Sequence, residues 1–450
     1  MVNTLFLPEL REMLANENKR GLGEFCTALN PARTADYMEG LAADEAWMVL
    51  QTADIPLRAE IFSYFEWDRQ IELLRSQDPA QLAKLMAQLA ADDRVDLLQE
   101  LDDQARVDEI LAFLSVTDRR DTLRLQSYPE GTAGALMTTE IARLPERLTV
   151  RGALEELSRQ AEDLETIYYL YVVDDENRLR GVVSTRQLVS SLAKPELRLG
   201  DLMETDAIVA EVTEDQETVA EKVAKYNLLA IPVVDSSRKL LGIITHDDVM
   251  DVMVQEMTED FQRISAVAPL EEGYLETNLL TLSWKRGSWL TVLFFGALLT
   301  AFALKRYGNE LEAFVWLGYF IPLIISTGGN SGSQSATLII TALSTGDITM
   351  SDWMKVIFRE WLMGLMLGGG LAVVGFLIAL LLAPTWKAAL VIPITILLVV
   401  SCGTIVGSML PLIFKRFGLD PAIMSNPFVS GIIDIVGILV YINVARILLR

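Results

Sequence analysis

The sequence is poor in cysteine and histidine, the two residue types that bind soft metals. Cys26, Cys402 and His246 are the only such residues among 450. Cys26 lies in an acidic region and Cys402 in an apolar one, which excludes a disulfide framework. Zinc, copper or iron sites would lack ligands. Any metal that the protein handles must be bound by oxygen atoms, which favours hard cations such as Mg²⁺ or Ca²⁺.

Charge is nearly absent from the last third of the chain. The residues from Trp284 onward include seven acidic and eleven basic ones, whereas those before it include 54 acidic and 27 basic ones. Hydrophobic residues make up 51% of the chain despite a net charge of −23. This segregation predicts an acidic soluble part followed by a membrane part, and it excludes a soluble enzyme. The acidic balance also argues against nucleic acid as a partner.

Five long uncharged stretches predict helices that span a lipid bilayer. They cover residues 287–304, 313–346, 361–386, 388–414 and 421–445, the last interrupted by Asp434. A spanning helix needs about 20 mostly apolar residues, so five fit and six do not. The opening residues lack the apolar core of a signal peptide. We therefore expect a multi-pass protein of the cell membrane, with its acidic part in the cytoplasm and its C-terminus outside.

The second stretch contains a run of small and polar residues from Ser326 to Ser335. Such residues are poorly suited to face lipid, because polar groups at membrane depth need protein or water beside them. The run therefore predicts either a hydrated pathway or a tight seam between helices. Asn330 and Gln334 are four residues apart and share one helical face, which favours the pathway.

Asp434 lies near the middle of the last stretch, with isoleucine and valine around it. A carboxylate at that depth costs about 2.5–3.5 kcal/mol on insertion scales, and no basic residue lies at a comparable depth. It is either a protonated or hydrogen-bonded structural group or a cation site, and we favour the cation site. Asn426 lies about two turns earlier. Pro427 suggests a broken helix at that level.

The acidic part contains two internal repeats. Within residues 1–130, the segment 41–51 resembles 89–99, which predicts an array of short helices. Asp92 and Asp96 fall in the second copy, four residues apart on one helix face, as is common on a solvated acidic surface. Further on, residues 172–184 match 233–245 at an offset of 61 residues, and each copy reads as strand, turn, strand and helix.

The second repeat resembles a tandem pair of CBS modules, a regulatory fold that often holds adenosine nucleotides. In that family the last acid of a Gly-x-x-Ser/Thr-x-x-Asp motif binds the ribose. The second copy has Thr245 and Asp248 at the motif positions. The resemblance therefore implies a nucleotide such as ATP at these two residues. The first copy departs from the motif, because Gln187 stands in place of the acid.

The whole order of parts resembles the MgtE family of magnesium channels and transporters. Two strings carry the resemblance, residues 328–338 and residues 420–427, with Asp434 fourteen residues after Asp420. It implies a multidomain protein with the following parts: an all-α superhelical N-domain (1–130), a first CBS module (131–196), a second α/β CBS module (197–254), a connecting or plug helix (255–276), and an all-α transmembrane pore domain of five helices (277–450).

The resemblance also implies an activity, which is Mg²⁺-selective uptake through one pore on the two-fold axis of a homodimer. Cytoplasmic Mg²⁺ would bind between the acidic domains and close the pore. The implied pore residues are Asp434, Asn426, Gly329, Ser326, Ser333 and Ser430. Three of them depart from the family pattern: Ser326 stands for glycine, Ser333 for asparagine and Ser430 for alanine. Because all three remain small, we expect a changed conductance and the same ion.

The resemblance assigns regulatory Mg²⁺ to carboxylates of the acidic part and of one membrane loop. These are Glu60, Asp92, Asp96, Asp215, Glu217, Asp248, Asp251, Glu256, Glu259 and Asp420. Asn227 replaces an aspartate of the family, so we expect one such site to be weakened or absent.

Other functions explain less of the sequence. A secondary carrier that exchanges Mg²⁺ or another divalent cation for Na⁺ or H⁺ would use the same Asp434, so it stays open. An intramembrane serine protease would need a base, and His246 lies in the soluble part. A membrane-anchored nucleotide sensor would leave Asp434 unexplained. We therefore expect a transporter without enzymatic activity and without a protein substrate.

Overall fold

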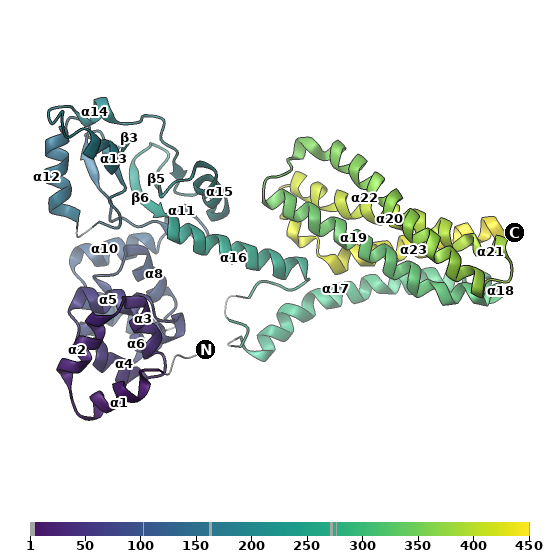
Figure 1. Ribbon diagram of the computed structural model, residues 1–450, viewed down its shortest axis with the longest axis horizontal. Helices are drawn as coiled ribbons and strands as arrows, with labels where there is room; N and C mark the ends of the chain where they lie inside the picture. The colour runs from purple at the N-terminus through teal and green to yellow at the C-terminus, as the bar shows by residue number, and fades with distance from the viewer. Residues whose placement is uncertain (1–4, 102, 162–163, 271–272, 276, 450) are drawn as a thin grey trace. The chain divides into compact units, whose positions relative to one another are not determined.

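The computed structural model describes residues 5–101, 103–161, 164–270, 273–275 and 277–449. The chain forms two units, Met1–Met253 and Val254–Arg450. The boundary between them falls inside a long helix, α16 (His246–Ile264), which is labelled in Figure 1.

The first part of the chain is a stack of short helices. They are α1 (Leu7–Ala15), α2 (Lys19–Ala28), α3 (Pro31–Met38), α4 (Ala43–Leu50), α5 (Ile55–Ser63), α6 (Trp67–Ser76), α7 (Pro79–Met86), α8 (Ala91–Gln99), α9 (Gln104–Phe113) and α10 (Val116–Leu125). Most of them pack against the next helix but one, as α4 does on α6, α5 on α7 and α8 on α10. This stacking confirms the helical array that the first repeat predicted.

Two arginines, one buried and one half-buried, join these helices. Arg94 is 2% exposed, and its guanidinium donates hydrogen bonds to the carbonyls of Met86 (2.8 Å) and Leu89 (2.9 Å) at the end of α7. Arg58 donates in the same way to the carbonyl of Leu50 at the end of α4. The last carbonyls of a helix have no donor within the helix. The Met86 and Leu50 carbonyls each accept a backbone N–H three residues on, and the arginines add a second hydrogen bond.

Two three-stranded sheets follow. The first contains β1 (Arg143–Pro145), β2 (Tyr169–Val173) and β3 (Leu179–Ser184), and the second contains β4 (Ala210–Glu211), β5 (Ala230–Val234) and β6 (Leu240–Thr245). In each sheet the first strand is parallel to the second, and the third is antiparallel to it. The helices of this part are α11 (Ala133–Leu136), α12 (Val150–Gln160), α13 (Thr185–Ser190), α14 (Leu199–Leu202) and α15 (Gln216–Tyr226). The repeated strand–turn–strand–helix pattern is thereby confirmed.

The connecting helix differs from its predicted bounds. It begins at His246, directly after β6, and ends at Ile264, whereas the resemblance implied a connecting helix over 255–276. The early start is fixed by Asp248, whose carboxylate accepts hydrogen bonds from both the backbone and the hydroxyl of Thr245. The end is marked by Ala266, which adopts a left-handed φ of 61°. Residues 271, 272 and 276 of the implied range lie outside the described residues.

The membrane part contains five long helices among the described residues. They are α17 (Leu279–Arg306), α19 (Ile321–Ser344), α20 (Trp353–Leu382), α22 (Val391–Arg416) and α23 (Asn426–Leu449), with shorter segments α18 (Gly308–Ala313), η2 (Val315–Phe320), η3 (Met350–Asp352), α21 (Trp386–Ala389) and η4 (Pro421–Ile423). Of the described segments, four are long and apolar enough to cross a membrane, and they contain α17, α20, α22 and α23. Because α19 carries the polar run, the number of five spans stays a prediction.

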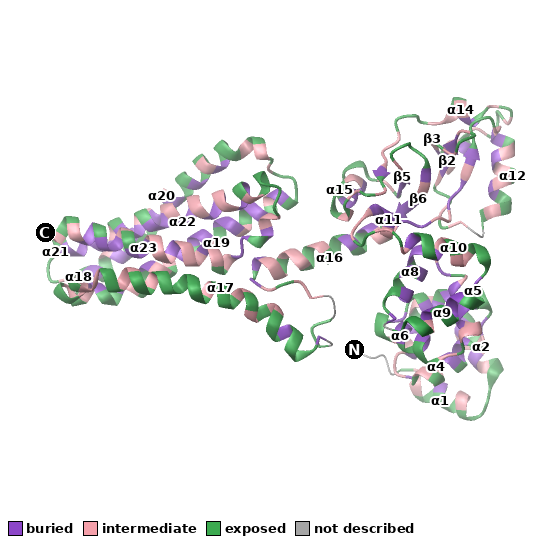
Figure 2. Cartoon of the chain, turned by 180° about the vertical axis from the view of Figure 1, so that it is seen from behind, coloured by how far each residue is buried: buried purple, intermediate pink, exposed green. Residues whose placement is uncertain are grey.

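These helices differ in how much of their surface is buried. Helices α19 and α22 share an extensive contact, α20 packs against α22, and α23 packs against both α19 and α22. The apolar window of α17 has no buried residue, and Figure 2 shows most of this helix exposed. Apolar side chains on the outside of a long helix are what a bilayer requires.

Glycines allow α19 and α22 to approach at backbone distance. A Cβ added to Gly403 would lie 2.8 Å from the carbonyl oxygen of Gly328, and one added to Gly407 would overlap the carbonyl of Gly332. One face of the small-residue run is therefore a tight seam between helices, which was one of the two interpretations that the sequence allowed.

We predict that Gly407→Ala destabilises the membrane part, because the new methyl group would push against backbone atoms of α19. Overpacking of this kind typically costs about 1–3 kcal/mol, which a lower melting temperature of the detergent-solubilised protein would reveal. Gly370→Ala in α20 is the matched control, since nothing lies within 4 Å of its added Cβ. Equal melting temperatures for the two variants would contradict the seam.

Candidate functional site

Hydrogen bonds join α19 to the start of α23. The hydroxyl of Ser333 donates to the backbone carbonyl of Asn426, and that of Thr337 donates to the Asn426 side-chain oxygen, both at 3.1 Å. Pro427 lies in the first turn of α23 and does not break a helix, so that prediction was wrong. A proline at this position removes an N–H that has no partner in a helix anyway.

Asp434 lies two turns further along α23, half-buried against α19. Its Oδ1 atom is buried and has no hydrogen-bond partner among the described residues. A Cβ added to Gly329 would lie 3.5 Å from this atom and would collide with the hydroxyl of Ser430. The missing side chain at Gly329 thus lets α19 lie directly against Ser430 and Asp434. The structure brings these three predicted pore residues together.

The remaining face of α19 is polar and exposed. It carries Ser326, Asn330 and Gln334 at intervals of four residues, and the Asn330 amide donates to the Ser326 hydroxyl at 3.4 Å. Residues four apart lie on one side of a helix. We call Ser326, Asn330 and Gln334 the polar stripe of α19. Its exposure in a single chain leaves it available to water or to a second copy.

A second set of carboxylates lies in the first unit, between α8 and the start of α16. Asp92 is 7% exposed, and its Oδ1 atom has no hydrogen-bond partner among the described residues. Burial raises the pKa of Asp92 well above its usual range, and the charge of Asp248 raises it further. Burial also raises the pKa of Asp248, against hydrogen bonds from Thr245 that lower it.

Further carboxylates surround this pair. Burial among neighbouring acids raises the pKa of Asp93 and Asp96 to about 6 and that of Glu165 to about 7. The side chains of all three are nevertheless exposed to solvent, so screening weakens both the desolvation and the repulsion. We call Asp92, Asp93, Asp96, Glu165 and Asp248 the acidic cluster.

The sequence analysis missed two members of the acidic cluster. Asp93 could have been found as the neighbour of Asp92 in an acidic first turn. Glu165 had no local signal, because the fold of the first CBS module brings it to α8 from a distant part of the chain.

The acidic cluster fits a hydrated cation better than a fully coordinated one. Among the described residues, no three Asp, Glu, His or Cys side chains converge closely enough to hold a metal ion directly. Mg²⁺ sheds its water reluctantly and is usually bound through one or two carboxylates with several waters retained. The orphaned Oδ1 of Asp92 is the atom that such an ion would satisfy.

The two motif positions of the CBS copies act as helix caps. Asp248 accepts from Thr245 at the start of α16, and Gln187 exchanges hydrogen bonds with Ser184 at the start of α13. The amide of Gln187 also donates to Glu204 at 2.8 Å. The last motif residue therefore caps the following helix in both CBS copies, but it is an acid, Asp248, only in the second copy.

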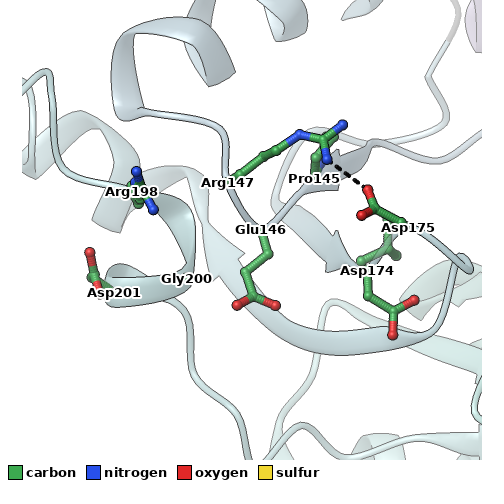
Figure 3. Close-up of a pocket in the computed structure, with 9 residues that line it drawn as sticks. Pro145, Glu146, Arg147, Asp174, Asp175, Arg198, Gly200 and Asp201 are labelled. Carbon is green, nitrogen blue, oxygen red and sulfur yellow. Dashed lines mark hydrogen bonds and ion pairs between the residues drawn. The ribbon is translucent and has the colours of Figure 1, made fainter.

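A cavity of about 370 Å³ opens between the ends of β1 and β2 and residues 198–201, and none of the motif residues lines it (Figure 3). Its rim carries Arg147 and Arg198 together with four carboxylates, and Arg147 pairs with Asp175 at 2.8 Å. None of the predicted site residues lines it.

Arg263 pairs with two predicted regulatory carboxylates in the second unit. Its guanidinium contacts Glu259 within α16 at 2.8 Å and also Asp420 in the loop before α23. Nearby, the Ser344 hydroxyl donates to Asp260 at 3.3 Å. Glu259 and Asp420 therefore already have a basic partner in the single chain, and their role as Mg²⁺ ligands stays a prediction.

The other predicted regulatory residues are dispersed. Glu60 and Asp251 are exposed, Glu256 is half-buried, and Asp215 caps α15 by accepting from the backbone of Glu217. Asn227 ends α15 in a left-handed conformation with φ of 51°, which asparagine tolerates well. The structure does not gather these residues with the acidic cluster, apart from Asp251, whose charge raises the pKa of Asp93.

Family comparisons match consecutive parts of the chain. Residues 29–131 match the MgtE intracellular N domain, residues 133–194 and 199–255 match the CBS domain, and residues 321–444 match the MgtE divalent cation transporter domain.

Curated relatives match over most of their length. The magnesium transporter MgtE of Thermus thermophilus is 36% identical over 98% of both chains. That of Bacillus subtilis is 30% identical over 86% of this chain and 84% of that protein. That of Enterococcus faecalis is 36% identical over 72% of this chain and 71% of that protein.

Two solved structures resemble the soluble part. The soluble part of a magnesium transporter has 33% identity and a TM-score of 0.52, covering 55% of this chain and 97% of that one. The cytosolic domain of the Mg²⁺ channel MgtE in complex with ATP has 35% identity and a TM-score of 0.51. The match covers 54% of this chain and 98% of that one.

We predict that the acidic cluster makes α8 less stable as the pH rises from about 4 to about 7 without Mg²⁺. The folded pKa values lie above the unfolded ones, so the folded state binds more protons in this range and loses stability as they leave. Hydrogen exchange of α8 in the full chain, corrected for intrinsic rates, measures this. Exchange of α4 serves as the control. Protection of α8 that is independent of pH would contradict the prediction.

Proposed function

We infer that the protein transports Mg²⁺ across a membrane, because the chain belongs to the MgtE family of divalent cation transporters. Its relatives over nearly the full length are magnesium transporters, and its soluble part resembles that of a Mg²⁺ channel. The protein has a helical N-domain, a CBS pair and a membrane part of several apolar helices. Transport does not require catalysis, so we assign it no enzymatic activity.

The environment of Asp434 is the main evidence for the proposed permeation path. This carboxylate lies in an apolar helix, with one oxygen buried and unpaired among the described residues, and Gly329 packs directly against it. An ionised carboxylate at membrane depth is unfavourable unless water or a cation accompanies it. We propose that Mg²⁺ passes beside Asp434 with its hydration shell, since direct coordination would require dehydration. Asn426, Gly329, Ser326, Ser333 and Ser430 complete the path.

We propose that two copies enclose this path. The polar stripe of α19 is exposed on the single chain, although polar groups at membrane depth must not face lipid. Pairing of two copies across a two-fold axis would turn both stripes and both Asp434 carboxylates towards one aqueous conduit. The N-domain and CBS pair would lie in the cytoplasm, and an odd number of spans would place the C-terminus outside.

Regulation by cytoplasmic Mg²⁺ rests on the acidic cluster. Its members repel one another, and desolvation raises the pKa values of Asp92 and Asp248. A divalent cation offsets both effects, so it stabilises the arrangement in which α8 lies against the start of α16. We propose that this arrangement closes the pore when cytoplasmic Mg²⁺ is high. Saturable sites of this kind each contribute about 1.4 kcal/mol at tenfold the dissociation constant.

ATP is the second ligand implied for the soluble part. The solved relative contains ATP in its cytosolic domain. We propose Thr245 and Asp248 as the residues that bind its ribose in this chain. Because Asp248 also belongs to the acidic cluster, nucleotide and Mg²⁺ would share this carboxylate.

The coupled carrier that the sequence left open is not favoured, because the solved relative is a channel. A carrier would move a second ion in fixed proportion to Mg²⁺, whereas a channel conducts along the gradient of Mg²⁺ alone.

We predict that Asp434→Ala abolishes Mg²⁺ flux into proteoliposomes or its selectivity, because the path loses the charge that compensates the cation. The measurement compares flux at equal amounts of reconstituted protein. Asp347→Ala, in the loop after α19, is the control and should conduct normally. Undiminished, selective flux through Asp434→Ala would refute this path.

We predict that the double variant Asp92→Asn and Asp248→Asn flattens the dependence of flux on internal Mg²⁺, because the cation has two fewer charges to neutralise. Asp36→Asn, an exposed change on α3, should leave that dependence unchanged. If the double variant kept the midpoint and steepness of the unmodified protein, the acidic cluster would not be the sensor.

A further inference from the structure

A second carboxylate, Glu360, lies inside the membrane part and away from the polar stripe. It is 9% exposed and lies about two turns into α20. The hydroxyl of Ser335 on α19 donates a hydrogen bond to its Oε2 atom at 2.6 Å. No lysine or arginine forms an ion pair with Glu360 in the part of the chain that the structure describes.

Helix α22 holds the backbone of Glu360 from the other side. The hydroxyl of Thr404 donates to the Glu360 carbonyl oxygen at 2.9 Å. One turn later, Gly364 lies so close to α22 that an added Cβ would be 2.6 Å from the Thr404 hydroxyl and 2.7 Å from Ser401 Cα. The position of Glu360 is therefore fixed by close backbone packing, and its carboxylate is presented to α19 at a set distance.

Ser335 stands on the same helix as Gly329, six residues later, which is a rise of about 9 Å. The other side of α19 is held by Ser333 and Thr337, which donate to Asn426. Helix α19 packs mainly against α22 and α23, and the hydrogen bond from Ser335 to Glu360 ties it to α20 as well. Loss of this hydrogen bond would remove one of the polar contacts that set the rotation of α19, and small shifts of Gly329 relative to Asp434 would follow.

We propose that Glu360 is a positioning residue for ion selection. By accepting the hydrogen bond from Ser335 in a site with little water, it holds α19 at the rotation and depth that set Gly329 against Asp434. This inference rests on the proposed permeation path, and it assigns to Glu360 an acceptor role that does not depend on contact with the ion.

A double-mutant cycle on the full chain tests the proposal. Flux of Mg²⁺ and of Co²⁺ into proteoliposomes is measured for Glu360→Leu, Ser335→Ala and the two combined. Each single change should lower the Mg²⁺ to Co²⁺ flux ratio by about tenfold, as the loss of a buried hydrogen bond allows. The double variant should be no worse than either single one, because both remove the same contact. Additive effects would overturn the coupling.

Two further variants separate positioning from charge and from stability. Glu360→Gln retains an acceptor oxygen, so it should restore most of the selectivity; a loss equal to that of Glu360→Leu would overturn the acceptor role. Ser408→Ala is the matched control, because this buried serine donates only within α22. If Ser408→Ala lowered the flux ratio as much as Ser335→Ala, the effect would be general destabilisation. Absence of Mg²⁺ flux in the unmodified protein would instead refute the proposed function.

Discussion

Carboxylates that are shielded from water and lack a basic partner are the constraint on which both parts of this protein depend. Asp434 in the membrane part and Asp92 in the acidic part each have a buried oxygen without a hydrogen-bond partner among the described residues. An ionised group in such a place needs an external cation or a proton. An unpaired buried carboxylate oxygen therefore occurs twice, at Asp434 on the proposed path of the ion and at Asp92 in the proposed Mg²⁺ sensor.

Helix α19 shows how one short run of small and polar residues can satisfy several neighbours. Its glycines pack against the backbone of α22, its serines and Thr337 bond to Glu360 and Asn426, and its polar stripe stays open. The two interpretations that the sequence allowed, a tight seam and a hydrated path, therefore apply to different faces of the same helix. A helix with 3.6 residues per turn can present these faces within ten residues.

The sequence predicted the parts of the protein better than their contacts. The offset of 61 residues gave both strand pairs, and the isolation of Asp434 in an apolar stretch marked it as unusual. Glu165 could not be found in this way, because no periodicity links it to α8. Glu360 was passed over because it borders an uncharged stretch, where a charge normally marks the membrane surface. The broken helix predicted at Pro427 was wrong because proline breaks a helix only in its interior, and the sequence alone did not show that Pro427 lies in a first turn.

The contacts of α16 differ in chemistry between its two ends. At its start, Asp248 belongs to a group of carboxylates that can be neutralised by protons or divalent ions. Near its end, Arg263 pairs with Glu259 and Asp420, and a guanidinium keeps its charge at any physiological pH. These half-exposed ion pairs weaken mainly as ionic strength rises. Acidification to about pH 6 therefore changes the charge around the start of α16, whereas the cation near its end keeps its charge.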